Sequence, residues 1–230
     1  MRTLRKALPL SFMVLILGLA GTPVQAQAQA FEGTLTFVAR GVDGDKTITE
    51  WVKGTDTRYD FAPAGSTSAQ GTMIIDGSAK TRTVIMPSRR AYMTAPYDPA
   101  SRKPAAAGKS DVKWTRTGKT ETVAGVKCEV IHGVGTENGK PKEADICVAK
   151  GFGFGGGSTG GGPFSEALTE YANLSLAPGE GIVKMTSIED GKSQVQLELT
   201  KVDRRKLAGT DFQPPAGFTK MERPGAASQP

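Results

Sequence analysis

Short runs of alternating apolar and polar residues, separated by turn residues, dominate the chain from residue 31 onward. The first run, "FEGTLTFVAR", places Phe31, Leu35, Phe37 and Ala39 on one side of an extended backbone. Five similar runs follow, with Gly, Asp or Pro between them: "KTITEWVKG", "TRYDF", "GTMIID", "TRTVIMP" and "RAYMTA". This repetition is typical of an antiparallel meander, so we expect a single, mainly β domain.

The second half of the chain continues the pattern with two hairpins. "GVKCEVIHG" and "EADICVAK" flank a segment rich in turn residues that includes Asn138–Gly139, a strong hairpin signal. A last hairpin is predicted in "GIVKMTSIEDGKSQVQLELTKVDR", with its turn at residues 189–192. The segment "YDPASRKPAAAGKS", residues 97–110, is predicted to be an exposed loop within the same domain.

One helix is predicted, over residues 163–175. Pro163 suits the first turn of a helix, and Glu166 is favourable near the positive end of the helix dipole. Phe164, Leu168 and Tyr171 form an apolar stripe at helical spacing. We therefore expect an amphipathic helix packed on the apolar face of the sheet.

The two cysteines, Cys128 and Cys147, lie on the two strands of the first predicted hairpin. Antiparallel pairing would bring their sulfur atoms within bonding distance. An even number of cysteines favours a disulfide if residues 1–30 direct the chain out of the cytoplasm, as argued below. The alternative is a metal site in which both thiolates act with His132, the one histidine of the sequence, and an acid such as Asp145. We expect the disulfide, because an oxidising compartment joins the thiols first, and no metal or cofactor.

The glycine stretch after Cys147 contains Gly151, Gly153 and Gly156 at the G-x-G-x-x-G spacing of dinucleotide-binding loops. The sequence "GGGSTGGGPF" that follows offers no helix start at the third glycine, and no P-loop lysine is present. We therefore interpret residues 151–162 as a flexible connection, or as a flap over a pocket.

The first thirty residues have the three parts of a secretory signal peptide. "MRTLRKALPL" is basic, "SFMVLILGLAG" is apolar, and "TPVQAQAQA" offers cleavage after Ala26, Ala28 or Ala30. Without these residues, which hold three basic and no acidic side chains, the net charge falls from +6 to +3. We expect a monomer exported to the periplasm or the extracellular space, a single domain over residues 31–222, and a disordered tail over residues 223–230.

Charge and motifs argue against nucleic-acid binding and catalysis. The basic residues are scattered rather than clustered on one face, which excludes a nucleic-acid footprint. The sequence has no G-x-S-x-G nucleophile elbow between a strand and a helix, and no H-E-x-x-H. It has no convincing carboxylate pair either, apart from acids such as Asp60 and Asp76 that folding would have to bring together. We expect a protein that is not an enzyme.

The C-terminal segment "LTKVDRRKLAGTDFQPPAGFTKM" resembles the signature of a family of exported bacterial proteins of unknown function, in which a strand leads to F-x-x-P-x-G-F. The resemblance extends to "FEGTLTF", "EWVKGTDTRYDF", "MIIDGSAKTRTVIMPSRRAYM" and "GKTETVAGVKCEVIHG". Such sequences are also distantly similar to the LolA/LolB superfamily of periplasmic lipoprotein carriers. That resemblance implies a curved antiparallel sheet or unclosed β-barrel of about ten strands, with the helix on its concave side and Arg58 at the mouth of an apolar cavity.

Two functions are consistent with this sequence. The first is binding or carriage of an apolar ligand, a lipid or a lipoprotein acyl chain, in the half-barrel. The alternative is a structural or protein-interaction module of the cell envelope. For the first, the candidate lining residues are aromatic, arginine and methionine side chains: Trp51, Arg58, Tyr59, Phe61, Met73, Met86, Tyr92, Met93 and Trp114.

Overall fold

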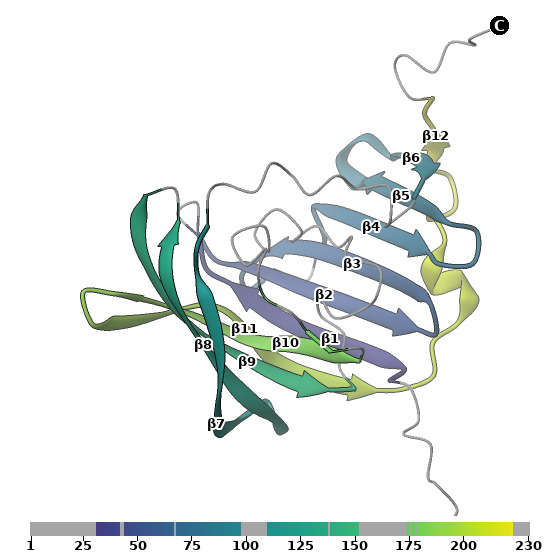
Figure 1. Ribbon diagram of the computed structural model, residues 1–230. Helices are drawn as coiled ribbons and strands as arrows, with labels where there is room; N and C mark the ends of the chain where they lie inside the picture. The colour runs from purple at the N-terminus through teal and green to yellow at the C-terminus, as the bar shows by residue number, and fades with distance from the viewer. Residues whose placement is uncertain are drawn as a thin grey trace, which may run out of the picture.

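The computed structural model describes the greater part of the predicted domain (Figure 1). The described residues are 31–41, 44–66, 68–97, 110–137, 139–151, 174, 176–177 and 179–222. The predicted signal peptide, the predicted tail and the glycine stretch after Gly151 therefore lie outside the described residues.

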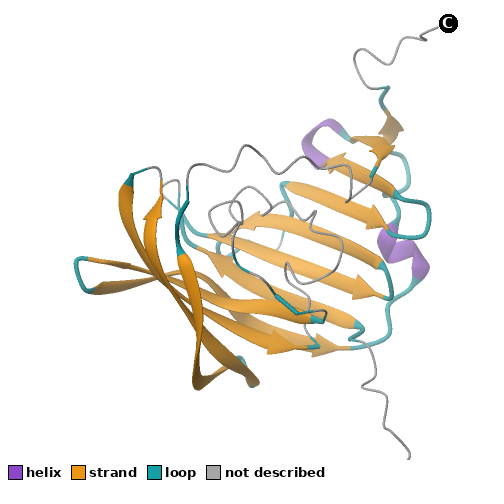
Figure 2. Cartoon of the chain, viewed as in Figure 1, coloured by secondary structure: helices purple, strands orange, loops and turns teal. Residues whose placement is uncertain are grey.

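Twelve strands form one sheet, in the order β12-β6-β5-β4-β3-β2-β1-β11-β10-β9-β8-β7 (Figures 1 and 2). Every neighbouring pair is antiparallel except β12 and β6, which are parallel. The strands are β1 (Gly33–Ala39), β2 (Lys46–Lys53), β3 (Asp56–Pro63), β4 (Gly71–Asp76), β5 (Thr81–Met86), β6 (Ala91–Pro96), β7 (Lys113–Val123), β8 (Val126–Glu137), β9 (Lys140–Lys150), β10 (Glu180–Glu189), β11 (Lys192–Arg204) and β12 (Thr219–Lys220).

The sheet is curved and unclosed, because β12 and β7 stand at its two ends and do not pair with each other. This confirms the prediction of a mainly β, antiparallel, curved architecture. The strand number is twelve rather than about ten. The additional short strand β12 comes from the proline-containing C-terminal segment, which carries no alternating pattern.

Helical structure within the described residues is limited to two 3-10 turns, η1 (Pro87–Arg89) and η4 (Gly209–Phe212). The amphipathic helix predicted over residues 163–175 falls outside the described residues except for Leu174, and Leu174 is not helical. Leu174 instead packs, half-buried, against the core. None of the helices in the described segments has the length and apolar character needed to cross a membrane.

Tight turns with two consecutive residues at positive φ connect the long strands. Ala124 and Gly125 have φ of 47° and 79° between β7 and β8, and Asp190 and Gly191 have φ of 50° and 71° between β10 and β11. Two-residue hairpin turns of this kind match the natural twist of the strands they join. The turn predicted at residues 189–192 is confirmed, and Glu189 pairs directly with Lys192.

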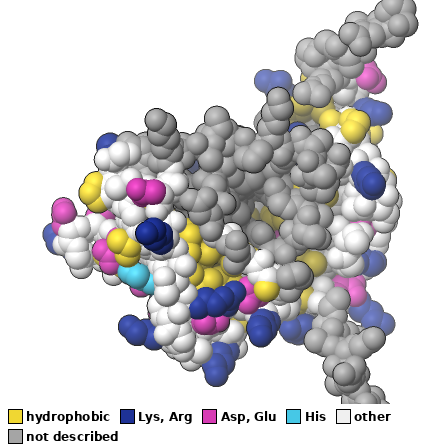
Figure 3. Space-filling view, viewed as in Figure 1, with side chains coloured by type: hydrophobic (Ala, Val, Ile, Leu, Met, Phe, Trp, Pro, Cys, Tyr) yellow, Lys and Arg dark blue, Asp and Glu magenta, His cyan; other side chains and the backbone are white. Residues whose placement is uncertain are grey.

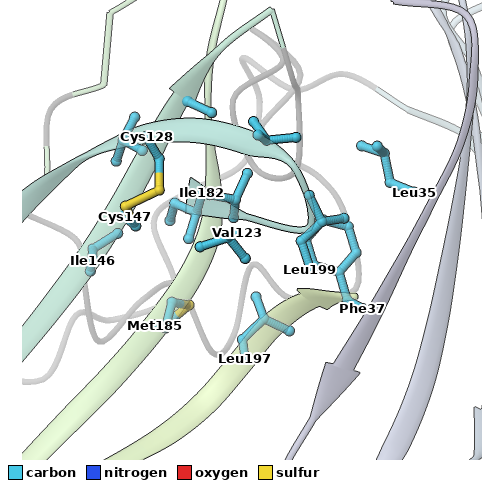
Figure 4. Packing of buried hydrophobic residues seen from close by; sticks show 14 of the residues in the cluster. Leu35, Phe37, Val123, Cys128, Ile146, Cys147, Ile182, Met185, Leu197 and Leu199 are labelled. Carbon is cyan, nitrogen blue, oxygen red and sulfur yellow. A yellow bond between two sulfur atoms is a disulfide. The ribbon is translucent and has the colours of Figure 1, made fainter. Parts of the chain in front are cut away.

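One face of the sheet, here called the concave face, carries the main core. Leu35 and Phe37 of β1 are fully buried, and they belong to one cluster with Ile146 of β9 and Leu199 of β11. Figure 4 shows Val123, from the end of β7, near Ile182 and Leu199 in this cluster. Because the sheet bends around this face, strands that are far apart in the ladder share a single core.

The predicted hairpin and disulfide are both present. Glu137 of β8 pairs with Lys140 of β9, and Cys147 lies opposite Val130 in the same ladder. The bond joins Cys128 to Cys147, whose Cα atoms are 5.4 Å apart (Figure 4). Both cysteines are buried, with 3% of their surface exposed. The disulfide therefore ties β8 to β9 inside the core.

The C-terminal segment after β11 returns across the face opposite the concave one. The backbone N–H of Leu207 donates to Glu32 Oε1 at 2.8 Å, and Lys53 Nζ donates to the Leu207 carbonyl at 2.6 Å. Farther along, η4 packs against β3, and Arg58 Nη1 donates to the Asp211 carbonyl at 2.9 Å. The segment ends in β12, which pairs with β6. The chain thus covers one sheet edge with its own C-terminal region.

Removal of the disulfide by the double substitution Cys128→Ala/Cys147→Ala should lower the free energy of unfolding by about 3 kcal/mol, the expected value for closing a loop of this length. Urea denaturation of the variant and the wild type measures the difference. The wild type treated with reductant should lose a similar amount. A change below about 0.5 kcal/mol in both experiments would show that the bond does not contribute to stability.

A second prediction concerns the contact between Arg58 and the C-terminal segment. Arg58→Met removes both the hydrogen bond to the Asp211 carbonyl and the ion pair with Asp60, so it should destabilise the fold by about 1–3 kcal/mol. The matched control is Arg40→Met, because Arg40 is exposed and its ion pair with Asp45 is long, at 3.8 Å. We expect that control to change stability by less than about 0.5 kcal/mol in thermal or urea unfolding. Equal changes in the free energy of unfolding for the two substitutions would show that the contact of Arg58 with the C-terminal segment does not stabilise the fold.

Candidate functional site

A row of directly paired residues runs across the concave face through five strands. Leu35 pairs with Glu50, Glu50 with Tyr59, Tyr59 with Met73, and Met73 with Val84. Directly opposed residues in an antiparallel sheet point to the same face, with their Cβ atoms about 5 Å apart. An acidic side chain therefore stands in the middle of an otherwise apolar and aromatic row.

Glu50 is closed off from solvent, with 1% of its surface exposed. Tyr59 Oη donates a hydrogen bond to Glu50 Oε1 at 3.0 Å. Glu50 Oε2 is also buried, and it has no hydrogen-bond partner among the residues that the structure describes. A buried polar atom without a partner is rare in folded proteins, so Glu50 is the most unusual group on this face.

Burial determines the charge of this pair. Loss of solvation raises the pKa of Glu50 from 4.5 to about 8, and the hydrogen bond from Tyr59 offsets only part of that effect. Burial raises the pKa of Tyr59 as well, and the neighbouring Glu50 adds to the increase. Both side chains are therefore uncharged at neutral pH. A neutral carboxyl can donate a hydrogen bond as well as accept one.

The sequence contained a signal for Glu50 that the choice of lining residues did not use. In "KTITEWVKG", Glu50 alternates with Ile48 and Val52, so it is predicted to share their face. An acid at a position that the strand pattern assigns to the core marks a candidate functional residue. The candidate lining residues were aromatic, arginine and methionine side chains, and Glu50 was therefore not among them.

The structure divides the candidate lining residues between the two faces of the sheet. Tyr59, Phe61, Met73, Met86 and Met93 share the concave face with Glu50, as their pairing with Glu50, Ile48 and Val84 requires. Trp114 lies opposite Gly133, and a Cβ at Gly133 would meet its ring at 2.3 Å, so the ring lies directly over the glycine. Trp51, Arg58 and Tyr92 lie on the opposite face. The ligand role of all these residues stays a prediction.

On that opposite face, Trp51, Arg58 and Asp60 form a compact polar cluster. Asp60 accepts hydrogen bonds from Trp51 Nε1 at 2.9 Å, Arg58 Nε at 3.0 Å and Thr72 Oγ1 at 2.6 Å. The guanidinium groups of Arg58 and Arg205 lie 5.1 and 5.0 Å from the centre of the Trp51 ring, within cation–π range. Because Arg58 and Arg205 belong to the contact with the C-terminal segment, this cluster has a structural role.

The possible acid pair of Asp60 and Asp76 is not formed. Asp60 lies opposite Thr72 in the ladder, whereas Asp76 is four residues farther along β4, which corresponds to roughly 13 Å. Asp76 Oδ1 accepts a hydrogen bond from the backbone N–H of Ala79 in the following turn. The two carboxylates therefore do not face one another.

A second polar group surrounds His132 on β8. His132 Nδ1 lies 2.7 Å from Asp145 Oδ1, and the ring borders an open pocket of about 780 Å³ together with Lys119, Glu121 and Glu143. The metal site considered for His132 requires the two thiolates, which are joined in the disulfide instead. Within the described part of the chain, no three His, Cys, Asp or Glu side chains are placed to hold a metal ion.

Seen from outside, hydrophobic side chains gather near the centre of the view in Figure 3, and charged side chains lie around them. The described residues of the concave face belong to a single sheet, and they include no second sheet or helical layer packed against it. The most distinctive chemistry of this face is the neutral Glu50–Tyr59 pair within an apolar row. We take this row as the candidate functional site.

The raised pKa of Glu50 predicts how the free energy of unfolding changes with pH. The unfolded chain releases the Glu50 proton near pH 4.5, whereas the folded chain retains it up to about pH 8. Between these values the folded state binds more protons, so the free energy of unfolding should fall as the pH rises. We expect wild type to lose about 2–4 kcal/mol relative to Glu50→Gln between pH 4.5 and 8, as measured by urea denaturation. Parallel pH profiles would show that Glu50 is ionised in the folded state.

Comparison with known proteins places the chain in an uncharacterised family. Residues 31–218 match the family model described as a domain of unknown function, DUF4412. No curated protein matches the chain. A solved chain from the structure of PNGF-II in a C2 space group is 11% identical and covers 82% of this chain at a TM-score of 0.42, a likeness too low to support an argument about fold or function.

The present chain spans about 30% of the length of that solved chain. The similarity to the LolA/LolB carriers stays a prediction from sequence motifs. The family model, in contrast, covers nearly the whole of the sequence that the structure describes. The chain belongs to the DUF4412 family, a family whose function is unknown.

Proposed function

We propose that this protein binds an apolar ligand, a lipid or a lipoprotein acyl chain, against the concave face of its sheet, and that it does so without catalysing a reaction. The observation that carries the proposal is the apolar row through Leu35, Tyr59, Met73 and Val84 on a curved, unclosed sheet. The described residues of this face come from one curved sheet, and the proposal places the apolar ligand along it.

Physical chemistry favours an alkyl chain as that occupant. Each methylene group that moves from water to an apolar wall contributes about 0.8 kcal/mol, so a chain of ten or more carbons gains enough to bind. Three methionines, Met73, Met86 and Met93, lie on the concave face of β4, β5 and β6. Flexible thioether side chains adapt to ligands of variable shape, which suits a carrier.

The compartment is part of the proposal. We infer that the protein acts outside the cytoplasm, in the periplasm or beyond, because a buried disulfide joins its two cysteines and disulfides persist in oxidising compartments. The sequence prediction of a signal peptide over residues 1–30 supports the same inference.

The alternative, an envelope module that docks another protein through an apolar patch, has less support. Among the described residues, the exposed large hydrophobic side chains are Val134, 51% exposed, and Met221, 37% exposed. Val134 belongs to β8 and Met221 follows β12, near opposite ends of the sheet. Protein-binding surfaces usually present a contiguous apolar patch, which two separate side chains do not provide.

A charge placed on the concave wall should abolish ligand binding. Val84→Asp introduces a carboxylate beside Met73 and Met93, and we expect it to weaken binding of a fluorescent fatty acid at least tenfold in a titration. Val38→Asp is the matched control, because Val38 is also a half-buried strand valine but lies on the opposite face, next to Thr47 and Glu198. Circular dichroism verifies that both variants fold.

Two results would contradict the proposal. One is the absence of binding by delipidated wild type at ligand concentrations up to about 100 µM, which corresponds to less than roughly 5–6 kcal/mol of binding free energy. The other is equal weakening by Val84→Asp and Val38→Asp, since that would place the fatty acid away from the concave face.

Native mass spectrometry of protein purified from its own cell envelope provides an independent test. The proposal predicts a co-purifying lipid that is lost in Val84→Asp and retained in Val38→Asp. A wild-type spectrum that shows the polypeptide alone, after purification without detergent, would favour the interaction module instead.

A further inference from the structure

The hydrogen-bonding state of Glu50 leaves one donor without an acceptor. Oε1 already accepts the hydrogen bond from Tyr59 Oη at 3.0 Å. When the carboxyl is neutral, its proton therefore resides on Oε2, the atom that has no partner within the described residues. A buried donor that lacks an acceptor is costly, so the fold maintains a hydrogen-bonding capacity that it does not use.

The surroundings of Glu50 limit what can use that capacity. Its partner on β1 is Leu35, and its partner on β3 is Tyr59, which lies in turn opposite Met73. Tyr97 is the further titratable group that acts on Tyr59, and it too is buried. No charged group among the described residues pairs with Glu50 on this face.

We propose that Glu50 Oε2 donates a hydrogen bond to an uncharged acceptor oxygen of the bound ligand, so that the preferred ligand is an alkyl chain with a carbonyl head group, such as an acyl ester. This inference rests on the proposed function, because it names the class of molecule that the concave face binds. It assigns the apolar row to the alkyl chain and the Glu50–Tyr59 pair to the head group.

The burial of Glu50 selects against charged head groups. Since only 1% of its surface is exposed, an acceptor has to enter the apolar interior to reach it. A carboxylate or a quaternary ammonium would lose its hydration there, and the ammonium would also require Glu50 to ionise. An ester carbonyl loses little hydration and accepts the single available hydrogen bond.

The pH range of the interaction follows from the ionisation of Glu50. Its pKa of about 8 means that the donor is present at neutral pH and is lost as the pH rises through 8. Affinity for an ester should therefore decrease above pH 8. Affinity for a cationic head group should increase over the same range, because ionised Glu50 would attract it.

The experiment compares three dodecyl-chain probes with different head groups: methyl dodecanoate, dodecanoate and dodecyltrimethylammonium. Each probe displaces a fluorescent fatty acid from wild type, Glu50→Gln and Glu50→Leu. We expect wild type to prefer the methyl ester, and Glu50→Leu to bind it about fivefold less tightly, the effect of one hydrogen bond. Glu50→Gln keeps an N–H donor, so it should retain the ester and lose the change in affinity above pH 8.

A double variant controls for the possibility that Glu50→Leu loses binding because it misfolds. Glu50→Leu alone leaves the Tyr59 hydroxyl without its acceptor, so Glu50→Leu/Tyr59→Phe removes both partners together and should fold at least as well as the single variant. It should show the same loss of ester preference. Thermal unfolding of each variant verifies that the comparison is made on folded protein.

The outcomes separate this inference from the function on which it rests. If wild type binds none of the probes and not the fluorescent fatty acid, the proposed function fails. If the probes bind but Glu50→Leu and the double variant retain the wild-type order, the proposed function stands and the role of Glu50 is overturned. Preference of wild type for dodecanoate or dodecyltrimethylammonium at pH 7 would also overturn it, because either result requires a charged head group at this position.

Discussion

The hydrogen-bonded ladder that joins all twelve strands into one sheet is the constraint on which the rest of the structure depends. Antiparallel pairing forces successive side chains onto opposite faces, so each of the long strands contributes to both the concave core and the opposite surface. Register shifts near Phe37, Arg116, Val183 and Thr186 interrupt the ladder locally. Such bulges increase bending and twist, which allows one sheet to curve around its own core.

The Glu50–Tyr59 pair has its unusual properties because of that curvature. An acid in the middle strand of a flat sheet would reach water, whereas on the concave face it is enclosed among Leu35, Tyr59 and Met73. Loss of hydration keeps the carboxyl neutral, and the tyrosine hydroxyl satisfies only one of its oxygens. A residue that opposes stability at neutral pH and lies in an apolar wall is a candidate functional residue.

The two faces of the sheet make different contacts. The opposite face attaches the C-terminal segment through Arg58, Asp60 and Lys53, and the same segment supplies the strand that covers the β6 edge. The disulfide ties β8 to β9 near the other end of the sheet. The C-terminal segment therefore covers one edge of the sheet, and the disulfide links two strands close to the other edge. The concave face is thereby left to the ligand that we propose.

The sequence by itself determined the local structure: the alternating strands, the hairpin that joins β8 to β9, the turn at residues 189–192, and the pairing of Cys128 with Cys147. These features depend on residues close in the chain, or on a hairpin whose register its own turn sets. Only the tertiary structure decided that the face of Trp51 and Arg58 receives the C-terminal segment, and that Glu50 has one oxygen without a partner among the described residues. The alternation in a strand shows which residues share a face, but curvature and the return of the C-terminal segment decide which face becomes the interior, and those depend on contacts between strands that are distant in the sequence.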